Sequence, residues 1–272
     1  MPEVGSKLIA ACVQMSSGDA KQANLEKAAR LIEQAAGRGA QLVLLPENCA
    51  FMGQTEQEKR VAAEGEADSP TLAFLSGLAK RYGILLVGGT ILLRGKGERL
   101  RNASPAFLPD GRLAGIYDKM HLFDVVLPEE QHTESKLIEP GGSPATVESD
   151  VWKLGLSVCY DLRFPELYRH YAMDGCNILT VPAAFTVPTG KAHWQTLLKA
   201  RAIENQCYVL AAGQCGEHPG KRRTYGHSMI VDPWGTVLAE LGDDEGIAIA
   251  ELSLDTLSDL RRRMPVLQHR RM

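Results

Sequence analysis

Short apolar runs of strand length alternate along the chain with segments whose apolar residues recur at helical spacing. In the first half this pattern predicts strands at Leu8–Met15, Leu42–Leu45 and Ile84–Leu93, helices at Gln22–Ala36 and Pro70–Tyr82, and a hairpin from Ala106 to Tyr117. Ser69 and Pro70 are a favourable N-cap and first residue for the second helix. Gly37 and Gly39 are expected to end the first helix.

The same order of elements recurs in the second half. It predicts strands at Trp152–Cys159, Ile178–Val181 and Cys207–Ala212, helices at Pro165–Asp174 and Lys191–Asn205, and a hairpin from Ser228 to Leu241. Two such halves indicate an internal duplication, although α/β chains also repeat by nature. Each half is a sheet covered by helices on one face, so the bare faces should pack together. The predicted fold is α/β, a four-layer α-β-β-α sandwich of two pseudo-symmetric halves in a single domain over residues 1–272.

Two segments lack a clear period. The first, Lys119–Gly142, separates the halves and is expected to be an ordered loop packed across the site. It is too apolar for a free linker, since it contains Leu122, Phe123, Val125, Val126 and Leu127. The second segment, Gly216–Arg223, is predicted to be a mobile surface loop.

Composition and charge narrow the possible partners. The chain has 272 residues, and 44% of them are hydrophobic, which is enough for one large core. Its formal net charge of −3 gives no general attraction for nucleic acid or for an anionic membrane. The basic clusters Arg261–Arg263 and His269–Arg271 are interpreted as a solvated helix end and tail, or alternatively as a contact surface for a partner subunit. We expect a small-molecule substrate and a homo-oligomer, a dimer or higher.

The six cysteines form no CxxC pair and have no metal-ligand spacing. They indicate reduced thiols, which are typical of the cytoplasm. The N-terminus has no basic-then-apolar signal pattern, and no apolar segment reaches the length of a membrane span. A cytoplasmic location without metal or cofactor is the expectation.

Cys159 lies where a strand should meet a helix. Apolar residues alternate from Trp152 to Val158, polar residues follow, and Pro165 is suited to begin a helix. Ligands of open α/β sheets bind beyond the carboxyl ends of strands, where backbone N–H groups can receive negative charge. Cys159 is therefore the best candidate nucleophile, although a lone cysteine is often only a small buried side chain.

Two charged residues also follow apolar strands. Glu47 comes after LVLLP and Lys119 after GIYD. A helix cap and a solvated surface charge are their plain alternatives. Together with Cys159 they suggest covalent catalysis, in which a shielded carboxylate acts as base. The lysine would favour the thiolate and, with the N–H of Tyr160, hold an oxyanion. A thiol of low pKa should then react with iodoacetamide faster than the other five.

Three segments resemble the glutamate, lysine and cysteine signatures of the nitrilase (carbon–nitrogen hydrolase) superfamily. They are LLPEN around Glu47, YDKMHLFD around Lys119 and GLSVCYDLRFPEL around Cys159, and the resemblance spans nearly the whole chain. It implies that these residues are general base, oxyanion stabiliser and nucleophile. It also implies a second glutamate in the loop before the cysteine, which is Glu134 here. The superfamily fold is the α-β-β-α sandwich, which the repeat predicts independently.

The segments Ala192–Gly216 and Tyr225–Glu240 are similar to the branch that hydrolyses ω-amides of 2-oxo acids. This similarity implies cleavage of deaminated glutathione to 2-oxoglutarate and cysteinylglycine through a Cys159 thioester. An ω-amidase acting on 2-oxoglutaramate is the nearest alternative, and another amidase or a nitrile hydrolase of the superfamily is a further one.

Arg163 is the candidate for substrate recognition, since it follows the nucleophile by four residues. Its guanidinium is interpreted as a bidentate clamp for the carboxylate of a 2-oxo acid. The alternative is a salt bridge with Asp161 or Glu166.

Two other classes of protein compete with this interpretation. A Cys–His hydrolase is less favoured, because none of the seven histidines follows a strand as Glu47 and Cys159 do. A binding scaffold with an inert Cys159 would leave two buried carboxylates around a lysine without a purpose.

Overall fold

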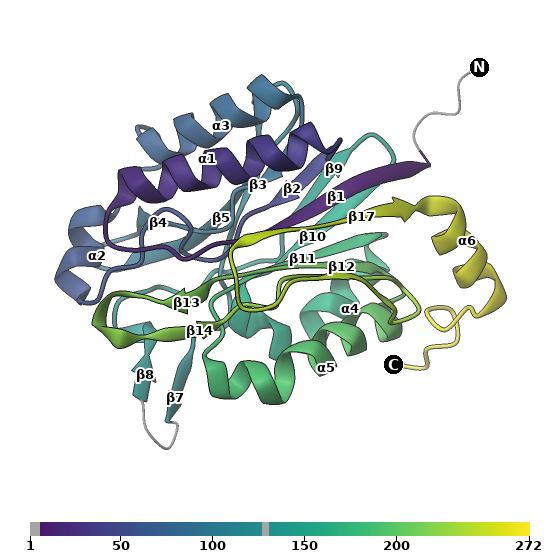
Figure 1. The fold of residues 1–272 in the computed structure, drawn as a ribbon. Helices are drawn as coiled ribbons and strands as arrows, with labels where there is room; N and C mark the ends of the chain where they lie inside the picture. The colour runs from purple at the N-terminus through teal and green to yellow at the C-terminus, as the bar shows by residue number, and fades with distance from the viewer. Residues whose placement is uncertain (1–5, 127–130) are drawn as a thin grey trace.

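The computed structural model describes residues 6–126 and 131–272 and places two β-sheets face to face between helices (Figure 1). Helices α1 (Lys21–Gly37) and α3 (Pro70–Tyr82) cover the outer face of the first sheet. Helices α4 (Pro165–Met173) and α5 (Val187–Asn205) cover the outer face of the second. The predicted α-β-β-α sandwich is confirmed.

The two sheets have matching topologies. The first runs β17 (Gly246–Ser253), β1 (Lys7–Gln14), β2 (Leu42–Leu44), β3 (Leu85–Val87), β5 (Leu100–Phe107) and β4 (Ile91–Arg94), with β6 (Leu113–Asp118) also paired to β5. The second runs β9 (Thr146–Ser149), β10 (Trp152–Leu156), β11 (Ile178–Ala183), β12 (Tyr208–Gly213), β15 (Met229–Val231) and β16 (Val237–Glu240). In each sheet, parallel strands (β1-β2-β3 and β10-β11-β12) are flanked on one side by an antiparallel strand, β17 or β9. A hairpin follows on the other side, so the pseudo-symmetry of the two halves extends to strand order.

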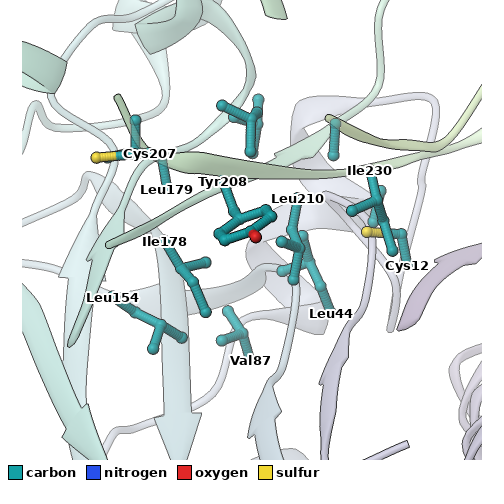
Figure 2. Packing of buried hydrophobic residues seen from close by; sticks show 14 of the residues in the cluster. Cys12, Leu44, Val87, Leu154, Ile178, Leu179, Cys207, Tyr208, Leu210 and Ile230 are labelled. Carbon is teal, nitrogen blue, oxygen red and sulfur yellow. The ribbon is translucent and has the colours of Figure 1, made fainter. Parts of the chain in front are cut away.

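Alternate side chains along each strand of the first sheet point into two different hydrophobic cores. In β2, Leu42 and Leu44 lie in the core between the sheets, whereas Val43 lies in the core beneath α1 and α3. Strand β3 repeats this division, because successive side chains of a strand point to opposite faces. Figure 2 shows the core between the sheets, where Leu44 and Val87 approach Ile178 and Leu210 of the opposite sheet. Both faces of the first sheet are therefore buried, which explains its continuous apolar runs.

Three predicted strands end elsewhere than expected, the strand expected from Ala106 begins at Leu100, and β9 and β17 had not been predicted. The apolar run Ile84–Leu93 forms two strands, β3 and β4, because the chain bends at Gly89 with a φ of +61°. A Cβ there would lie 2.1 Å from the carbonyl oxygen of Pro46, so only glycine permits this approach. Strand β10 ends at Leu156, and Cys159 begins the 3₁₀ helix η2 (Cys159–Arg163). Strand β11 does not end at Val181 before the proline, as predicted, but continues through Pro182 to Ala183.

Several helices and hairpins differ from expectation. Helix α5 begins at Val187, four residues before the predicted start, with Pro188 in its first turn. The segment Gly216–Arg223, predicted to be a mobile surface loop, is not an irregular loop. It belongs to an ordered hairpin of β13 (Cys215–Glu217), the 3₁₀ helix η3 (Pro219–Lys221) and β14 (Arg223–Tyr225). Its buried His218 bonds to Ser17 and Thr224, which holds the hairpin in place. Helix α2 (Glu56–Ala62) had not been predicted. Helix α6 (Leu254–Arg263) ends at the basic cluster Arg261–Arg263, as the interpretation of that cluster as a helix end predicted, although its start had not been predicted.

The segment between the halves carries a hairpin of β7 (Asp124–Val126) and β8 (Gln131–Thr133), followed by the 3₁₀ helix η1 (Glu134–Lys136). Leu127 lies outside the described residues. In the basic C-terminal cluster, Arg262 and Arg263 are exposed and pair with Asp259, whereas Arg261 donates to the carbonyl of Gln206. Among the residues described, no helix has the length and apolar character needed to cross a membrane.

Candidate active site

A cavity of about 250 Å³ lies beyond the carboxyl ends of β2 and β10. Glu47, Lys119, Glu134 and Cys159 all line it, although 112 positions separate the first from the last in sequence. The cavity suits a small molecule, since its volume is close to the lower end of the roughly 300–1,000 Å³ of ligand pockets.

Lys119 lies at the centre of the polar cluster. Its Nζ donates to Glu47 Oε1 at 3.0 Å and to Glu134 Oε2 at 2.8 Å. The side chain is only 2% exposed, and its backbone N–H donates to the carbonyl of Asn102 on β5. Two carboxylates therefore fix the ammonium group at the end of β6.

Asn102 links the two carboxylates from the other side. Its Nδ2 donates to Glu47 Oε1 at 3.0 Å and to Glu134 Oε1 at 3.2 Å. Glu134 also accepts the N–H of Phe123 at 2.7 Å, which joins the segment between the halves to the cluster. The Asn102 Oδ1 atom is buried without a hydrogen-bond partner among the described residues.

Cys159 lies on a strained turn. Its φ is +49°, a value that side chains other than glycine rarely adopt. The turn buries the thiol within hydrogen-bonding reach of the Glu47 carboxylate and of the backbone of Ala184. Its Sγ therefore reaches the polar cluster, while the side chain also packs with the core between the sheets.

Asp161 stabilises this turn and connects it to the segment after β6. Its Oδ2 accepts from the N–H of Val158 at 2.8 Å and the hydroxyl of Tyr117 at 2.8 Å. Its Oδ1 accepts the N–H of His121 at 3.0 Å and lies 2.7 Å from His121 Nδ1. A fully buried carboxylate therefore bridges the residues around Lys119 and Cys159.

Burial and charge set the protonation states of the cluster. Burial alone would lower the pKa of Lys119, but the charges of Glu134 and Glu47 raise it well above 10.5. Burial opposes ionisation of Glu47 too, yet Lys119 and the Cys159 thiol together hold its pKa below 4.5. For Cys159, burial and then the Glu47 charge raise the pKa well above 9.0, against the opposing effect of Lys119. The expectation that Lys119 makes Cys159 a thiol of low pKa was wrong, because the neighbouring carboxylate and burial outweigh the lysine.

Tyr160 and Arg163 follow Cys159 on the wall of the cavity. The N–H of Tyr160 lies in the first turn of η2, where backbone donors lack intrahelical acceptors. The Arg163 guanidinium lies over the rings of Tyr160 and Phe185 and within 3.2 Å of His193 Nδ1. The alternative prediction for Arg163, a salt bridge with Asp161 or Glu166, is not borne out by the described contacts. Both oxygens of Asp161 instead accept hydrogen bonds from Val158, Tyr117 and His121.

Sequence reasoning missed Asn102, Lys59 and Arg222 as residues of the cavity. Asn102 lies within a strand, and the two cations lie in polar segments that read as surface. Lys59 is on α2, and Arg222 precedes β14 in the hairpin thought to be mobile. The run of three cations from Lys221 to Arg223 could have indicated Arg222, whereas α2 has as many acids as cations and gives no such signal for Lys59. Within the described part of the chain, no group of three or more histidine, cysteine, aspartate or glutamate residues is placed to hold a metal ion.

The chain is similar to known proteins over nearly its whole length. Residues 9–262 match the family model described as carbon-nitrogen hydrolase. A deaminated glutathione amidase of Synechocystis sp. is 45% identical over 268 residues, covering 96% of this chain and 97% of that protein. The mouse (Mus musculus) deaminated glutathione amidase is 42% identical, covering 97% of this chain and 83% of that protein.

Among solved structures, the C. elegans NitFhit protein superposes with a TM-score of 0.89 at 38% identity. The match covers 97% of this chain, which spans 65% of the length of that protein.

Proposed function

This chain belongs to the carbon–nitrogen hydrolase family and is an amidohydrolase, and on that premise we propose that it hydrolyses deaminated glutathione to 2-oxoglutarate and cysteinylglycine. The relatives named for that activity support the substrate, since they match over nearly the full chain. The observation that carries the proposed chemistry is the ammonium of Lys119 held between two carboxylates beside a buried thiol.

In the first half-reaction, Cys159 is the nucleophile and Glu47 the general base. The thiol proton passes to Glu47 as Sγ forms a bond to the amide carbon, and the carbonyl oxygen becomes an oxyanion. The C–N bond then breaks, and the leaving nitrogen takes the proton from Glu47. The products of this step are the free amine and a thioester on Cys159.

Water completes the cycle. Glu47 accepts a proton from a water molecule while the hydroxyl adds to the thioester carbon. The tetrahedral intermediate expels Sγ, which recovers its proton from Glu47, and the carboxylic acid leaves. Its low pKa lets Glu47 accept the thiol proton only as the C–S bond forms, so the resting enzyme keeps a neutral thiol.

The oxyanion is stabilised by the Lys119 ammonium and the N–H of Tyr160. Glu134 positions Lys119 and the amide nitrogen of the substrate rather than starting proton transfer. The hydrogen bonds that Lys119 Nζ donates to both oxygens of Glu134 support this role, because they hold the ammonium group at the wall of the cavity.

Arg163 binds the carboxylate of the 2-oxo acid. Aromatic rings pack against its guanidinium, and no described carboxylate pairs with it, so its fork is available to a ligand. The same contact would serve 2-oxoglutaramate, and an ω-amidase acting on that compound therefore remains the second candidate.

Hydrolysis of deaminated glutathione and of 2-oxoglutaramate, measured side by side, tests the proposal. We expect the higher kcat/KM for deaminated glutathione. Cys159→Ala should abolish turnover with little effect on folding, because the side chain removed is small. Intact-protein mass spectrometry of the wild type should detect the 2-oxoglutaryl thioester. Substantial activity in Cys159→Ala would refute covalent catalysis at this residue.

The proposal extends to location and assembly. All six cysteines are buried and free, which supports the reducing cytoplasm. A homo-oligomer of two or more copies is supported by exposed apolar side chains, since Ile203 on α5 is 46% exposed and Trp234 is 65% exposed. These two residues are neighbours, because the turn at Gly235 packs against Ile203. Size-exclusion chromatography with light scattering measures the copy number, and a strictly monomeric protein would contradict this part.

A further inference from the structure

The cavity carries more positive charge than the proposed chemistry requires. Among the described residues that line it, Lys119, Arg163, Lys59 and Arg222 are cationic, whereas Glu47, Glu56 and Glu134 are acidic. The chain as a whole has a formal charge of −3, so the excess of cations is local. Such a cavity favours an anionic ligand.

Lys59 and Arg222 are the cations without a role so far. Neither forms an ion pair within the described part of the chain, although both are partly buried. Other partly buried cations of this protein do find acids: Lys21 pairs with Glu64, and Arg101 with Glu66 and Asp118. A partly buried cation without an acid is costly unless a ligand supplies the negative charge.

Arg222 also has an unused donor. One terminal nitrogen, Nη2, donates to the carbonyl of Ala184 at 3.3 Å. The Nε atom is buried and has no hydrogen-bond partner among the described residues. A carboxylate is the acceptor that best fits a free guanidinium edge.

The two cations also act on each other. After burial, the charge of Arg222 is the largest influence that lowers the pKa of Lys59. Acids act on Lys59 less strongly, with Glu134 and Glu56 the first of them. An anion bound at both cations would relieve this repulsion.

Arg222 lies on the wall of the cavity close to Glu47. Its charge is one of the influences that lower the pKa of Glu47, the residue that returns a proton to the leaving nitrogen. Arg163, by contrast, lies on the turn of the nucleophile, next to Tyr160 and Phe185. Lys59 and Arg222 therefore form one cationic pair, and Arg163 is a second cationic position on the wall of the same cavity.

We propose that Lys59 and Arg222 form a second carboxylate site, which binds the terminal carboxylate of the leaving amine while Arg163 binds that of the acyl group. This inference rests on the proposed function and deepens it. The enzyme then selects amides that carry a carboxylate on each side of the scissile bond. Deaminated glutathione has both carboxylates, whereas 2-oxoglutaramate has only the one on the acyl side.

Steady-state kinetics on two matched substrates test the second site. They are deaminated glutathione and its derivative with the glycine carboxylate converted to the N-methylamide. In the wild type, we expect the derivative to have a KM higher by roughly ten-fold or more, because a charge-assisted contact is lost. Lys59→Met should raise KM for the acid by about the same factor, with a smaller change in kcat. It should not raise KM further for the N-methylamide.

Controls separate binding from folding. Arg60→Met removes the neighbouring cation on α2, which donates to the carbonyl of Glu98 and does not line the cavity, and it should leave both KM values unchanged. Arg223→Gln is the matched control for Arg222→Gln, since Arg223 is exposed. Arg222→Gln also acts on Glu47, and its effect on the N-methylamide measures that indirect part. Lys59→Arg should recover much of the affinity if charge is what matters.

Equilibrium binding gives a readout that does not depend on turnover. Calorimetry with Cys159→Ala should find the acid bound about ten-fold more tightly than the N-methylamide, and Lys59→Met in that background should remove the difference. Equal affinity for the two compounds, or an equal loss for both on Lys59→Met, overturns the second site. Tight binding of the acid without hydrolysis by the wild type would instead contradict the proposed function and leave the second site supported.

Discussion

Replacing Asp161 by asparagine should damage both the stability and the rate of this enzyme, although Asp161 touches no substrate in the proposed mechanism. The carboxylate receives the N–H groups of Val158 and His121, one on each oxygen. In either orientation, an asparagine turns an NH₂ group towards one of these two donors. One buried backbone N–H therefore loses its acceptor, and the remaining bonds lose the charge that strengthens them.

The magnitude follows from these contacts. A buried donor left without a partner costs about 1–3 kcal/mol, and hydrogen bonds to a charged group contribute about 1.5–3 kcal/mol each. Since part of the bonding survives in asparagine, we expect Asp161→Asn to lower the free energy of unfolding by about 3–4 kcal/mol. Proteins have total stabilities of about 5–15 kcal/mol, so the variant should fold but unfold at lower denaturant. Tyr117→Phe removes one of the bonds to Asp161 and the bond that the hydroxyl accepts from the N–H of Met120, and it should cost about 1–3 kcal/mol.

Urea unfolding followed by circular dichroism measures the stability, and steady-state hydrolysis below the unfolding transition measures the rate. We expect kcat/KM of Asp161→Asn to fall by about 10²-fold, because small misplacements of catalytic groups have effects of that size. The double variant with Tyr117→Phe should lose less stability than the sum of the two single changes, since the two residues share one bond. A variant within about 0.5 kcal/mol of the wild type, with its rate intact, would refute this account of the turn.

Four further outcomes are expected from the cluster itself. Lys119→Ala should lower kcat by about 10²–10³-fold. Lys119→Arg should lose activity as well, because a planar guanidinium does not fit between the two carboxylates. Full activity of the arginine variant would contradict the need for a compact ammonium group. Glu134→Gln should reduce kcat while the thioester stays detectable by mass spectrometry, and no loss at all would place Glu134 outside the mechanism. Arg163→Lys should raise KM by about ten-fold with a smaller effect on kcat, and should add nothing for a substrate esterified at its 2-oxo acid. Glu47 loses its active ionised form only as pH falls through a pKa below 4.5, and Lys119 stays charged to well above pH 10.5. The pH profile of kcat/KM should therefore be level from about pH 5.5 to 9.5. A loss of activity on acidification near pH 7 would exclude Glu47 as the general base.

The alternation of apolar and polar residues was sufficient to predict the layers of the fold. Strands β1 and β2 and helix α3 have strong patterns, and Ser69 caps α3 through the N–H of Leu72 as expected. Helix α2 was missed because none of its residues is buried, so it has no apolar face in the sequence. The break between β3 and β4 was missed because it depends on Pro46, a residue from a distant part of the chain.

The candidate site was predictable where a charged residue ends an apolar strand. Glu47 and Lys119 stand out for that reason, since a polar group placed there must face either the core or a crevice. Asn102 gives no such signal, because it lies inside β5 and its purpose is visible only when both carboxylates are beside it. Lys59 and Arg222 lie in polar segments, and only the tertiary structure turns them towards the cavity.

The protonation state of Cys159 could not be predicted from residue types, because it depends on the balance of charge in a buried space. Ionising the thiol would place three negative charges, those of Cys159, Glu47 and Glu134, around the single ammonium of Lys119. Burial makes that excess costly, so the proton remains on sulfur until a substrate carbonyl arrives to accept the sulfur electrons. Cys159, the proposed nucleophile, is therefore distinguished from the other five cysteines by its access to the cavity and by an adjacent ionised carboxylate, and not by a low pKa. Slow alkylation by iodoacetamide is compatible with catalysis in this arrangement, because the reactive state forms only in the complex with the amide.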